Sequence, residues 1–173
     1  MLNYETVCAL VGEGMLGQSA LNAENELPSI LSQLGHFPDD SICLELGTLR
    51  GISTAVLASC FKRVITIDTQ YHSHRLSNWL KLNVEKKIEP YIVVDYAEEE
   101  ILIGRLDFDI AFIDTIHDEE NTRKAFEMVK KCGLVLFHDA HFEGVKKFVE
   151  SIGASISDSG IYAVWREERN GDT

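Results

Sequence analysis

Short apolar runs alternate with longer amphipathic segments over most of this chain. Residues 42–46, 63–68 and 109–114 are rich in Ile, Val, Leu and Phe, a composition typical of strands that are buried on both faces of a sheet. Segments with helical periodicity lie between these runs. Strands that alternate with helices predict an α/β fold in which helices cover both faces of a mostly parallel sheet.

Residues 72–87 show the clearest helical spacing. Leu76, Leu80 and Val84 recur four positions apart, and residues at this spacing share one face of a helix. Pro90 then ends the expected helix, because proline cannot continue one. We therefore predict a helix over residues 72–87.

The expected elements form one domain. A length of 173 residues is typical of a single domain, which here comprises residues 1–173. We expect a helical cap at 1–38, with a helix ending near Gly35, and a core at 40–166. The expected strands are 42–46, 63–68, 91–95, 109–114, 134–139, 154–157 and 161–165, and the expected helices of the core are 52–61, 72–87, 98–104, 118–131 and 142–152.

Acidic residues stand at the ends of five expected strands. Since the carboxyl ends of parallel strands meet at one edge of the sheet, where ligands bind in such folds, these carboxylates should gather there. Acids at strand ends also form turns and cap helices, but five of them on one edge favour a binding site. They are Glu45, Asp68, Asp95, Asp114 and Asp139.

A glycine turn follows the first strand. Gly47 and Gly51 allow the chain to pass directly from a strand into a helix. An acid about 20 residues past such a turn can bind both hydroxyls of a ribose, and Asp68 has this spacing. The segment therefore predicts a nucleoside site. A literal GxGxxG at 12–17 lacks the following strand and terminal acid of a dinucleotide site, and we interpret it as a loop.

The segment LELGTLRGIST at 44–54 resembles motif I of the class I S-adenosylmethionine-dependent methyltransferases, in the form found in macrocin-type and cephalosporin-hydroxylase-like enzymes. DIAFIDTIHDEENTRKAF, LVLFHDAHFEGVKKFV and GIYAVWR resemble the fourth-, fifth- and last-strand segments of that branch. The resemblance covers about residues 40–166. It implies a Rossmann-like, doubly wound sheet of seven strands in the order 3-2-1-4-5-7-6, with the last strand antiparallel.

The resemblance also implies a cofactor, S-adenosyl-L-methionine, and residues that bind it. Gly47 and Gly51 match the turn around its methionyl part, Glu45 matches the acid that orders this loop and faces the cofactor's amino group, and Asp68 matches the ribose acid. The other cofactor-binding residues that we expect are Thr48, Ser53, Thr69, Asp95, Tyr96 and Asp114, with Asp95 and Tyr96 beside the adenine.

Two catalytic roles follow from the same resemblance. His117 matches the base of the macrocin-type enzymes, and a histidine with a pKa near 6.5 can take a proton from a hydroxyl acceptor at neutral pH. Asp114 matches the acid near the methionyl end. We therefore expect methyl transfer to a small-molecule acceptor, at a hydroxyl oxygen.

A divalent metal ion is a further implication. Asp114 and Asp139 match metal-binding positions of relatives, and carboxylates suit Mg²⁺. His138 or His141 could add a nitrogen ligand. Two features oppose this site: Ala140 stands where metal-dependent relatives have a second acid or amide, and alternation along a strand would put His138 and Asp139 on opposite faces.

The composition and the charge limit the kinds of partner that the protein can bind. The net charge of −12, from 28 acidic and 16 basic residues, opposes binding to nucleic acid or to an anionic membrane, and no apolar run approaches the roughly 18 residues that span a bilayer. The first residues lack the basic cluster of a secretory signal, and the four cysteines stand singly. We expect a cytoplasmic protein with a small-molecule substrate. Homo-oligomerisation stays open.

Two other functions fit parts of the pattern. A nucleoside-binding module without catalytic activity would keep the cofactor residues and lack turnover. A nicotinamide-dependent oxidoreductase could use Asp68 for its ribose, but the bulky Leu49 and Arg50 between the glycines oppose a pyrophosphate lying on this backbone.

Overall fold

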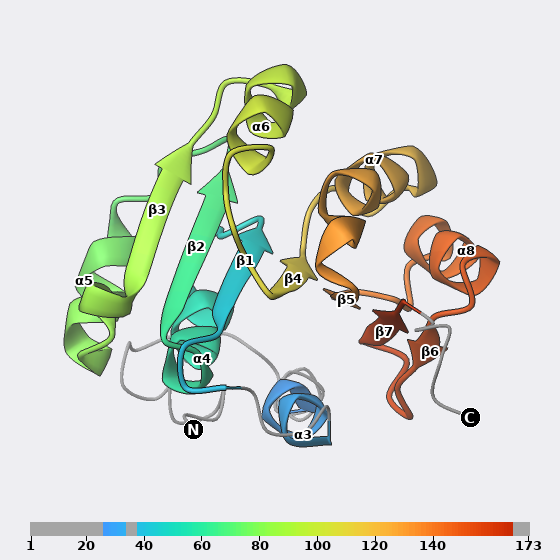
Figure 1. Cartoon of the computed structure of the whole chain (residues 1–173), viewed down its shortest axis with the longest axis horizontal. Coiled ribbons are helices and arrows are strands. Elements are labelled where there is room, and N and C mark those ends of the chain that lie inside the picture. The colour runs from blue at the N-terminus through green and yellow to red at the C-terminus, as the bar shows by residue number, and fades with distance from the viewer. Residues whose placement is uncertain (1–25, 34–37, 168–173) are drawn as a thin grey trace.

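The computed structural model describes residues 26–33 and 38–167. Seven strands form one sheet in the order β3-β2-β1-β4-β5-β7-β6 (Figure 1), which confirms the predicted order. The first five strands are parallel, and β7 is antiparallel to both of its neighbours. The strands are β1 (Ile42–Leu46), β2 (Arg63–Asp68), β3 (Ile88–Ile92), β4 (Ile110–Ile113), β5 (Leu134–Phe137), β6 (Ser155–Ile156) and β7 (Ala163–Arg166).

Helices cover both faces of the sheet, as predicted (Figure 1). Successive residues of the central strands belong to two separate cores: Cys43 and Val64 pack towards one face, while Leu44 and Ile65 pack towards the other. This is the alternation of a strand that is buried on both sides. The first core includes residues of α3 (Glu26–Gln33), α4 (Ile52–Cys60) and α5 (His74–Leu82), and the second includes residues of α6 (Tyr96–Ile103), α7 (Glu119–Val129) and α8 (Glu143–Ser151).

The predicted helix at 72–87 is shorter and turns a different face inward. It ends at Leu82, because Asn83 adopts a left-handed conformation with φ 55°, and the 3₁₀ turn η1 (Glu85–Lys87) follows. Leu76 and Leu80 are each 54% exposed, so the leucines that mark the helical spacing do not form the buried face of α5.

Polar residues of α5 are buried instead, because they serve the glycine turn. Arg75 and Asn78 are buried together with Trp79. Their side chains donate hydrogen bonds to three successive backbone carbonyls of the turn after β1, and buried carbonyls of this kind need such donors. The bonds run from Arg75 Nε to Leu49 O (2.6 Å), from Asn78 Nδ2 to Arg50 O (3.2 Å) and from Trp79 Nε1 to Gly51 O (2.8 Å).

The third strand also departs from the prediction. β3 begins before Pro90, which lies opposite Thr66 of β2, and it ends at Ile92 rather than at Asp95. Proline is tolerated here because β3 is the edge strand and needs no second partner. β1 and β2 have the predicted bounds, whereas 3₁₀ turn η2 (Lys130–Cys132) and Gly133 end the segment predicted as helix 118–131.

The predictions for residues 1–25, including the glycine motif at 12–17, and for Gly35 lie outside the described residues. Among the helices that the structure describes, none combines the length and apolar character that crossing a bilayer requires.

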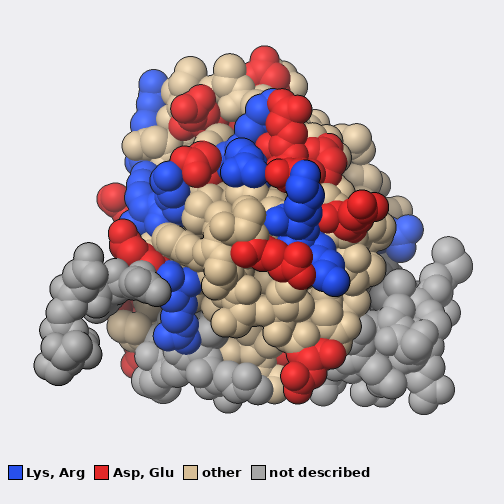
Figure 2. Space-filling view, turned by 90° about the vertical axis from the view of Figure 1, so that its right-hand side faces the viewer, with Lys and Arg blue, Asp and Glu red and all other residues tan. Residues whose placement is uncertain are grey.

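Basic and acidic side chains are mixed on the face that contains α7 and α8 (Figure 2). Several of the bases form ion pairs with neighbouring acids, which include Arg123 with Glu119 at 3.0 Å and Lys124 with Glu120 at 2.7 Å. Lys147 of α8 reaches Glu119 of α7 at 2.6 Å. Local acids therefore balance the positive charge of these residues.

Candidate active site

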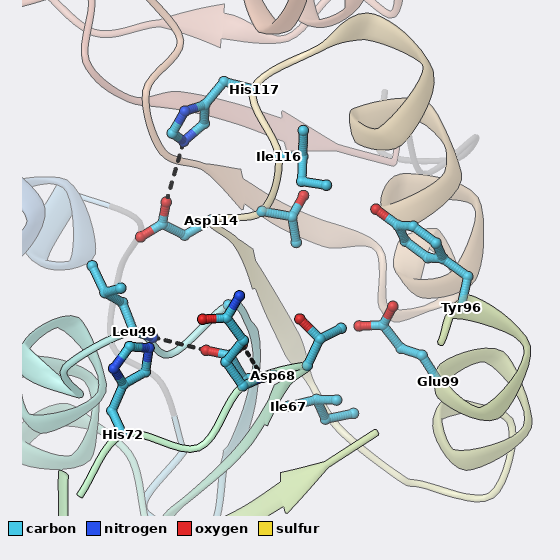
Figure 3. Close-up of a pocket in the computed structure, with 13 residues that line it drawn as sticks. Leu49, Ile67, Asp68, His72, Tyr96, Glu99, Asp114, Ile116 and His117 are labelled. Carbon is cyan, nitrogen blue, oxygen red and sulfur yellow. Dashed lines mark hydrogen bonds and ion pairs between the residues drawn. The ribbon is translucent and has the colours of Figure 1, made fainter. Parts of the chain in front are cut away.

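A cavity of about 450 Å³ opens at the carboxyl edge of the sheet (Figure 3). Its volume is typical of small-molecule sites. The last two residues of β2 and residues that follow β1, β2 and β4 form its wall together with the first turns of α6. Of the residues predicted from the sequence, it brings together Gly47, Asp68, Thr69, Tyr96, Asp114 and His117. Glu45, Thr48, Gly51, Ser53, Asp95 and Asp139 do not line it.

Both glycines of the turn are required by close packing. Gly47 has φ +89°, and a Cβ there would lie 1.8 Å from the carbonyl oxygen of Asp114. Gly51 has φ +75°, and its Cβ would lie 2.5 Å from Nε1 of Trp79. L side chains rarely adopt such backbone conformations. The turn can therefore bring the ends of β1 and β4 together only with glycine at position 47.

Asp68 holds the glycine turn in place. Its Oδ2 accepts the backbone N–H groups of Thr48 (3.0 Å) and Leu49 (2.9 Å) and forms an ion pair with Arg75. Its Oδ1 accepts the N–H of Gln70 at 3.0 Å. Burial would raise the pKa of the Asp68 carboxyl, but these N–H donors and the Arg75 charge outweigh burial and lower it.

Glu45 lies beneath the turn, in a buried hydroxyl network. It is fully buried, and its carboxylate accepts hydrogen bonds from Ser53 (2.7 Å), Thr54 (2.5 Å) and Thr66 (2.6 Å). Thr48 and Thr66 share a further hydroxyl contact of 2.5 Å. Burial raises the pKa of Glu45 to about 7, against the opposing effect of the three hydroxyls. In this structure Glu45, Thr48 and Ser53 therefore support the turn from below.

The two residues that were expected beside the adenine, Asp95 and Tyr96, lie in different surroundings. Asp95 is exposed and caps α6, since its Oδ1 accepts the N–H of Glu98 at 3.0 Å. Tyr96 lines the cavity, and so does Glu99 on the next turn of the same helix. Glu99 was missed because it lies in the run Glu98–Glu100, where no periodic pattern marks one glutamate as buried.

Six other wall residues are not among the predicted site residues, and all of them except His72 lie beside a predicted one in the sequence. Leu49 lies between the two glycines, Ile67 and Gln70 flank Asp68 and Thr69, and Thr115 and Ile116 lie between Asp114 and His117. Adjacency in the sequence was the signal that could have found these five.

Two histidines and two aspartates gather at the other side of the cavity, where Figure 3 shows His117 and Asp114. His117 Nε2 lies 3.0 Å from Oδ2 of Asp139 and 3.7 Å from Oδ1 of Asp114. His138 Nδ1 lies 3.2 Å from Oδ1 of Asp114 and 3.3 Å from Oδ2 of Asp139. The ring of His117 stacks on Phe142, with the ring centroids 4.7 Å apart. Asp139 therefore does not line the cavity itself but contacts His117, which does.

The expectation that His138 and Asp139 point to opposite faces is wrong. β5 ends at Phe137, and Asp139 adopts a left-handed φ of 56°, so strand alternation does not extend to these residues. One ligand atom from each of Asp114, His138 and Asp139 lies within 4.8 Å of the others. His141 Nδ1 is 3.7 Å from Oδ1 of Asp139.

Charges in this cluster shift the protonation of its members. Burial would raise the pKa of Asp114, but the hydrogen bonds and charges of His117 and His138 lower it to about 2. The Asp114 carboxylate in turn raises the pKa of His117, and the charge of Asp139 adds to the effect while burial opposes it. Asp114 therefore stays ionised beside a histidine of increased basicity.

Comparison with known proteins places this site in a family. A family model described as "Methyltransferase domain" matches residues 44–140, more than half of the chain, from β1 to the turn after β5. No curated protein sequence matches this chain.

Solved structures share the fold at low sequence identity. An O-methyltransferase from Bacillus cereus in complex with SAH has a TM-score of 0.65 at 18% identity, with 95% of this chain and 90% of that chain covered. The O-methyltransferase TomG from Streptomyces achromogenes, in complex with SAM, has a TM-score of 0.63 at 18% identity, over 94% and 88% of the two chains. An rRNA methylase from Streptococcus thermophilus has a TM-score of 0.60 at 17% identity, over 84% and 96%.

The family match includes the glycine turn, Asp68, Asp114, His117 and Asp139, and the sheet has the strand order that the sequence predicted. The chain therefore belongs to the methyltransferase-domain family and has the class I methyltransferase fold.

Proposed function

We propose that this methyltransferase transfers a methyl group from S-adenosyl-L-methionine to a hydroxyl oxygen of a small molecule, with His117 as the base. The observation that carries the proposal is that a single cavity is lined by both Asp68 and His117. A nucleoside on Asp68 and an acceptor beside His117 would therefore share one cavity. The O-methyltransferases with SAH or SAM among the structural neighbours support the same chemistry.

The cavity residues fit an adenosyl sulfonium. Among the described residues, Asp68 Oδ1 accepts one hydrogen bond, from Gln70, so a lone pair remains for a ribose hydroxyl. Asp68 and Asp114 carry lowered pKa values and stay ionised, which favours a positively charged ligand between them. Apolar side chains of Ile67 and Ile116 complete the wall.

The cofactor supplies a methyl group that is already activated by a positive sulfur. The protein must therefore align the acceptor and remove its proton. His117 Nε2 faces Asp139 and Asp114, so the neutral ring donates its Nε2 proton to these carboxylates. Nδ1 is then the atom that accepts the hydroxyl proton. The imidazolium that results is stabilised by the same two carboxylates.

The cluster of aspartates and histidines beside the cavity could also bind a divalent ion. Asp114, His138 and Asp139 could hold it, and a mixed set of carboxylates and imidazole suits Mn²⁺ as well as Mg²⁺. Such an ion would lower the pKa of a hydroxyl acceptor that approaches it. Oδ2 of Asp139 contacts His117 and His138 in this structure, so an ion on that oxygen would compete with His117 for it.

Calorimetric titration with Mn²⁺ and with Mg²⁺ tests this metal site. We expect the wild-type protein to bind one ion, and Asp139→Asn to weaken that binding by at least about tenfold, because a ligand is lost. Asp107→Asn, at an exposed acid remote from the cluster, should leave binding unchanged. Equal binding by both variants would exclude Asp139 as a ligand, and no binding by the wild type would exclude the metal site.

A turnover assay tests the proposed reaction. The protein is incubated with S-adenosylmethionine and a panel of phenols, catechols and sugar alcohols, and S-adenosylhomocysteine formation and acceptor mass are measured. The proposal predicts an acceptor that gains one methyl group. Cofactor binding without turnover on any acceptor would favour the nucleoside-binding module, and turnover confined to amine acceptors would refute the hydroxyl assignment.

A further inference from the structure

Phe142 lies beside His117, in the segment that connects β5 to α8. The two rings are stacked, with their centroids 4.7 Å apart and their planes inclined by 10°. Offset, nearly parallel stacking is one of the preferred arrangements of aromatic rings. Phe142 belongs to neither core of the sheet and is 43% exposed. Its ring therefore adds little to the packing of the fold, and it covers one face of the histidine that is proposed to act as the base.

The carboxylates beside His117 leave its ring one degree of freedom. Nε2 lies 3.0 Å from Oδ2 of Asp139, and Figure 3 shows the ring directed towards Asp114. Nδ1, the proposed proton acceptor, lies farther from the axis of the Cβ–Cγ bond than Nε2 does. Rotation about that bond therefore displaces Nδ1 more than Nε2, and a half-turn would put a carbon in its place. Because this torsion is broad in histidine, contacts at Nε2 constrain Nδ1 only weakly.

Stacking on Phe142 constrains the torsion that the carboxylates leave free. If His117 turned about its Cβ–Cγ bond, its ring would tilt into the ring of Phe142. The backbone of Phe142 is held on both sides, since its N–H donates to the carbonyl of Asp139 (3.0 Å) and its carbonyl accepts the N–H of Lys146 (2.8 Å). The ring of His141 contacts that of Phe142 as well, with the centroids 4.4 Å apart. Phe142 therefore gives the imidazole a fixed surface to stack on.

We propose that Phe142 is a positioning residue, which holds the imidazole plane of His117 so that Nδ1 faces the acceptor in the cavity. This inference rests on the proposed function, because it concerns the orientation of the base. A base must lie within hydrogen-bonding reach of the proton that it removes, and a misplacement of about 1 Å can cost roughly 10²-fold in rate. The role requires an aromatic side chain at position 142, since an aliphatic one has no flat face for the imidazole.

Side-chain NMR of the protein without ligands tests the orientation directly. The ring current of Phe142 should move the Cδ2–H and Cε1–H resonances of His117 upfield of those of the exposed His74, and His117→Ala identifies them by their loss. Phe142→Leu should abolish the upfield shift, and Phe142→Tyr should keep it. Lys146→Leu, at an exposed position of α8, is the matched control and should leave these resonances in place. An upfield shift that is absent from the wild type, or that survives in Phe142→Leu, would overturn the role of Phe142.

A double-mutant cycle tests the effect on catalysis, with S-adenosylmethionine and the phenol, catechol or sugar alcohol that the wild type methylates fastest. Phe142→Leu should lower kcat by at least about tenfold and leave the KM of the acceptor within about threefold, because the base acts only in the transition state. Phe142→Met, a second side chain without a ring, should behave in the same way, whereas Phe142→Tyr should keep kcat within about threefold. In His117→Ala, the further change Phe142→Leu should alter kcat by less than about twofold.

The outcomes separate this inference from the proposed function. If His117→Ala lowers kcat while Phe142→Leu and Phe142→Met keep it, the positioning role is overturned and the proposed function stands. The same holds if Phe142→Leu lowers kcat equally with and without His117, because its effect would then not pass through the base. A kcat that His117→Ala leaves unchanged, or a wild type that methylates no acceptor, would overturn the proposed function and this inference with it.

Discussion

The acids at the edge of the sheet differ widely in their surroundings, and their pKa values differ accordingly. Glu45 and Glu99 are buried, and their pKa values rise to about 7. Asp114 is held near a pKa of about 2 by two histidines. Groups whose pKa values are pushed apart in one region commonly divide binding and proton-transfer roles. Here the pattern leaves Asp114 ionised beside His117.

Glu45 should make the stability of the protein dependent on pH. Its pKa rises from 4.5 to about 7 on folding, so the contribution of this proton is fully present below pH 4.5 and is lost as the pH rises towards 7. The loss amounts to roughly 3 kcal/mol for a fully buried group. Glu45→Gln has no such proton, and its hydroxyl partners can also donate to or accept from an amide.

Urea unfolding between pH 4.5 and 8 measures this effect. As the pH rises, the unfolding free energy of the wild type should fall by roughly 3 kcal/mol more than that of Glu45→Gln. Glu100→Gln, at an exposed glutamate, should follow the wild-type curve. Parallel curves for the wild type and Glu45→Gln would contradict the buried, protonated state.

His117→Ala should separate binding from turnover. Loss of a general base commonly lowers kcat by about 10²–10⁴-fold, whereas the residues proposed to bind the ribose and the purine lie on the other side of the cavity. We therefore expect kcat to fall in that range and the affinity for S-adenosylhomocysteine to stay within about threefold. His74→Ala, at an exposed residue that does not line the cavity, serves as the control. A kcat that persists in His117→Ala would remove His117 as the base.

At the scale of elements, α5 and the glycine turn form one unit. Arg75, Asn78 and Trp79 donate to three successive carbonyls of the turn, and Arg75 also pairs with Asp68. The helix therefore fixes both the turn and the acid that is proposed to bind the ribose. Apolar spacing could not predict this face, because polar groups are buried here to satisfy backbone carbonyls.

Arg75→Met should disturb this unit while it keeps most of the side-chain volume. Breaking a buried pair costs about 3–5 kcal/mol, and Asp68 and the carbonyl of Leu49 both lose a donor. We expect the unfolding free energy to fall by about that amount and the affinity for S-adenosylhomocysteine to fall as well. Leu76→Gln, on the exposed face of the same helix, should change stability by less than about 0.5 kcal/mol. Equal effects of the two substitutions in thermal and calorimetric measurements would contradict the role of Arg75.

The sequence predicted central elements better than peripheral ones. β1 and β2 have the predicted bounds because strands buried on both faces are continuous apolar runs. β3 was misplaced because an edge strand accepts Pro90 and carries less apolar signal. In the candidate site, two of the acids at strand ends, Asp68 and Asp114, line the cavity at the edge where the sequence predicted a binding site. The approach of Asp139 to His138 was missed because a left-handed residue follows β5, and local patterns do not encode such a turn.

At the scale of the whole molecule, the fold and the family match both indicate a methyltransferase. The choice of methyl acceptor depends on the side chains of the site. The same fold occurs in two O-methyltransferases and in an rRNA methylase, so the architecture alone does not select an acceptor. The net charge of −12 supports the proposal of a small molecule, because nucleic-acid binding depends on neutralising phosphates.

The most direct measurement is a crystal structure of the protein with S-adenosylhomocysteine bound. The account predicts a ribose hydroxyl within hydrogen-bonding distance of Oδ1 of Asp68, the purine beside Tyr96, and the sulfur turned towards Asp114 and His117. An adenosyl group located outside this cavity, or inside it with the sulfur directed away from His117, would contradict the account.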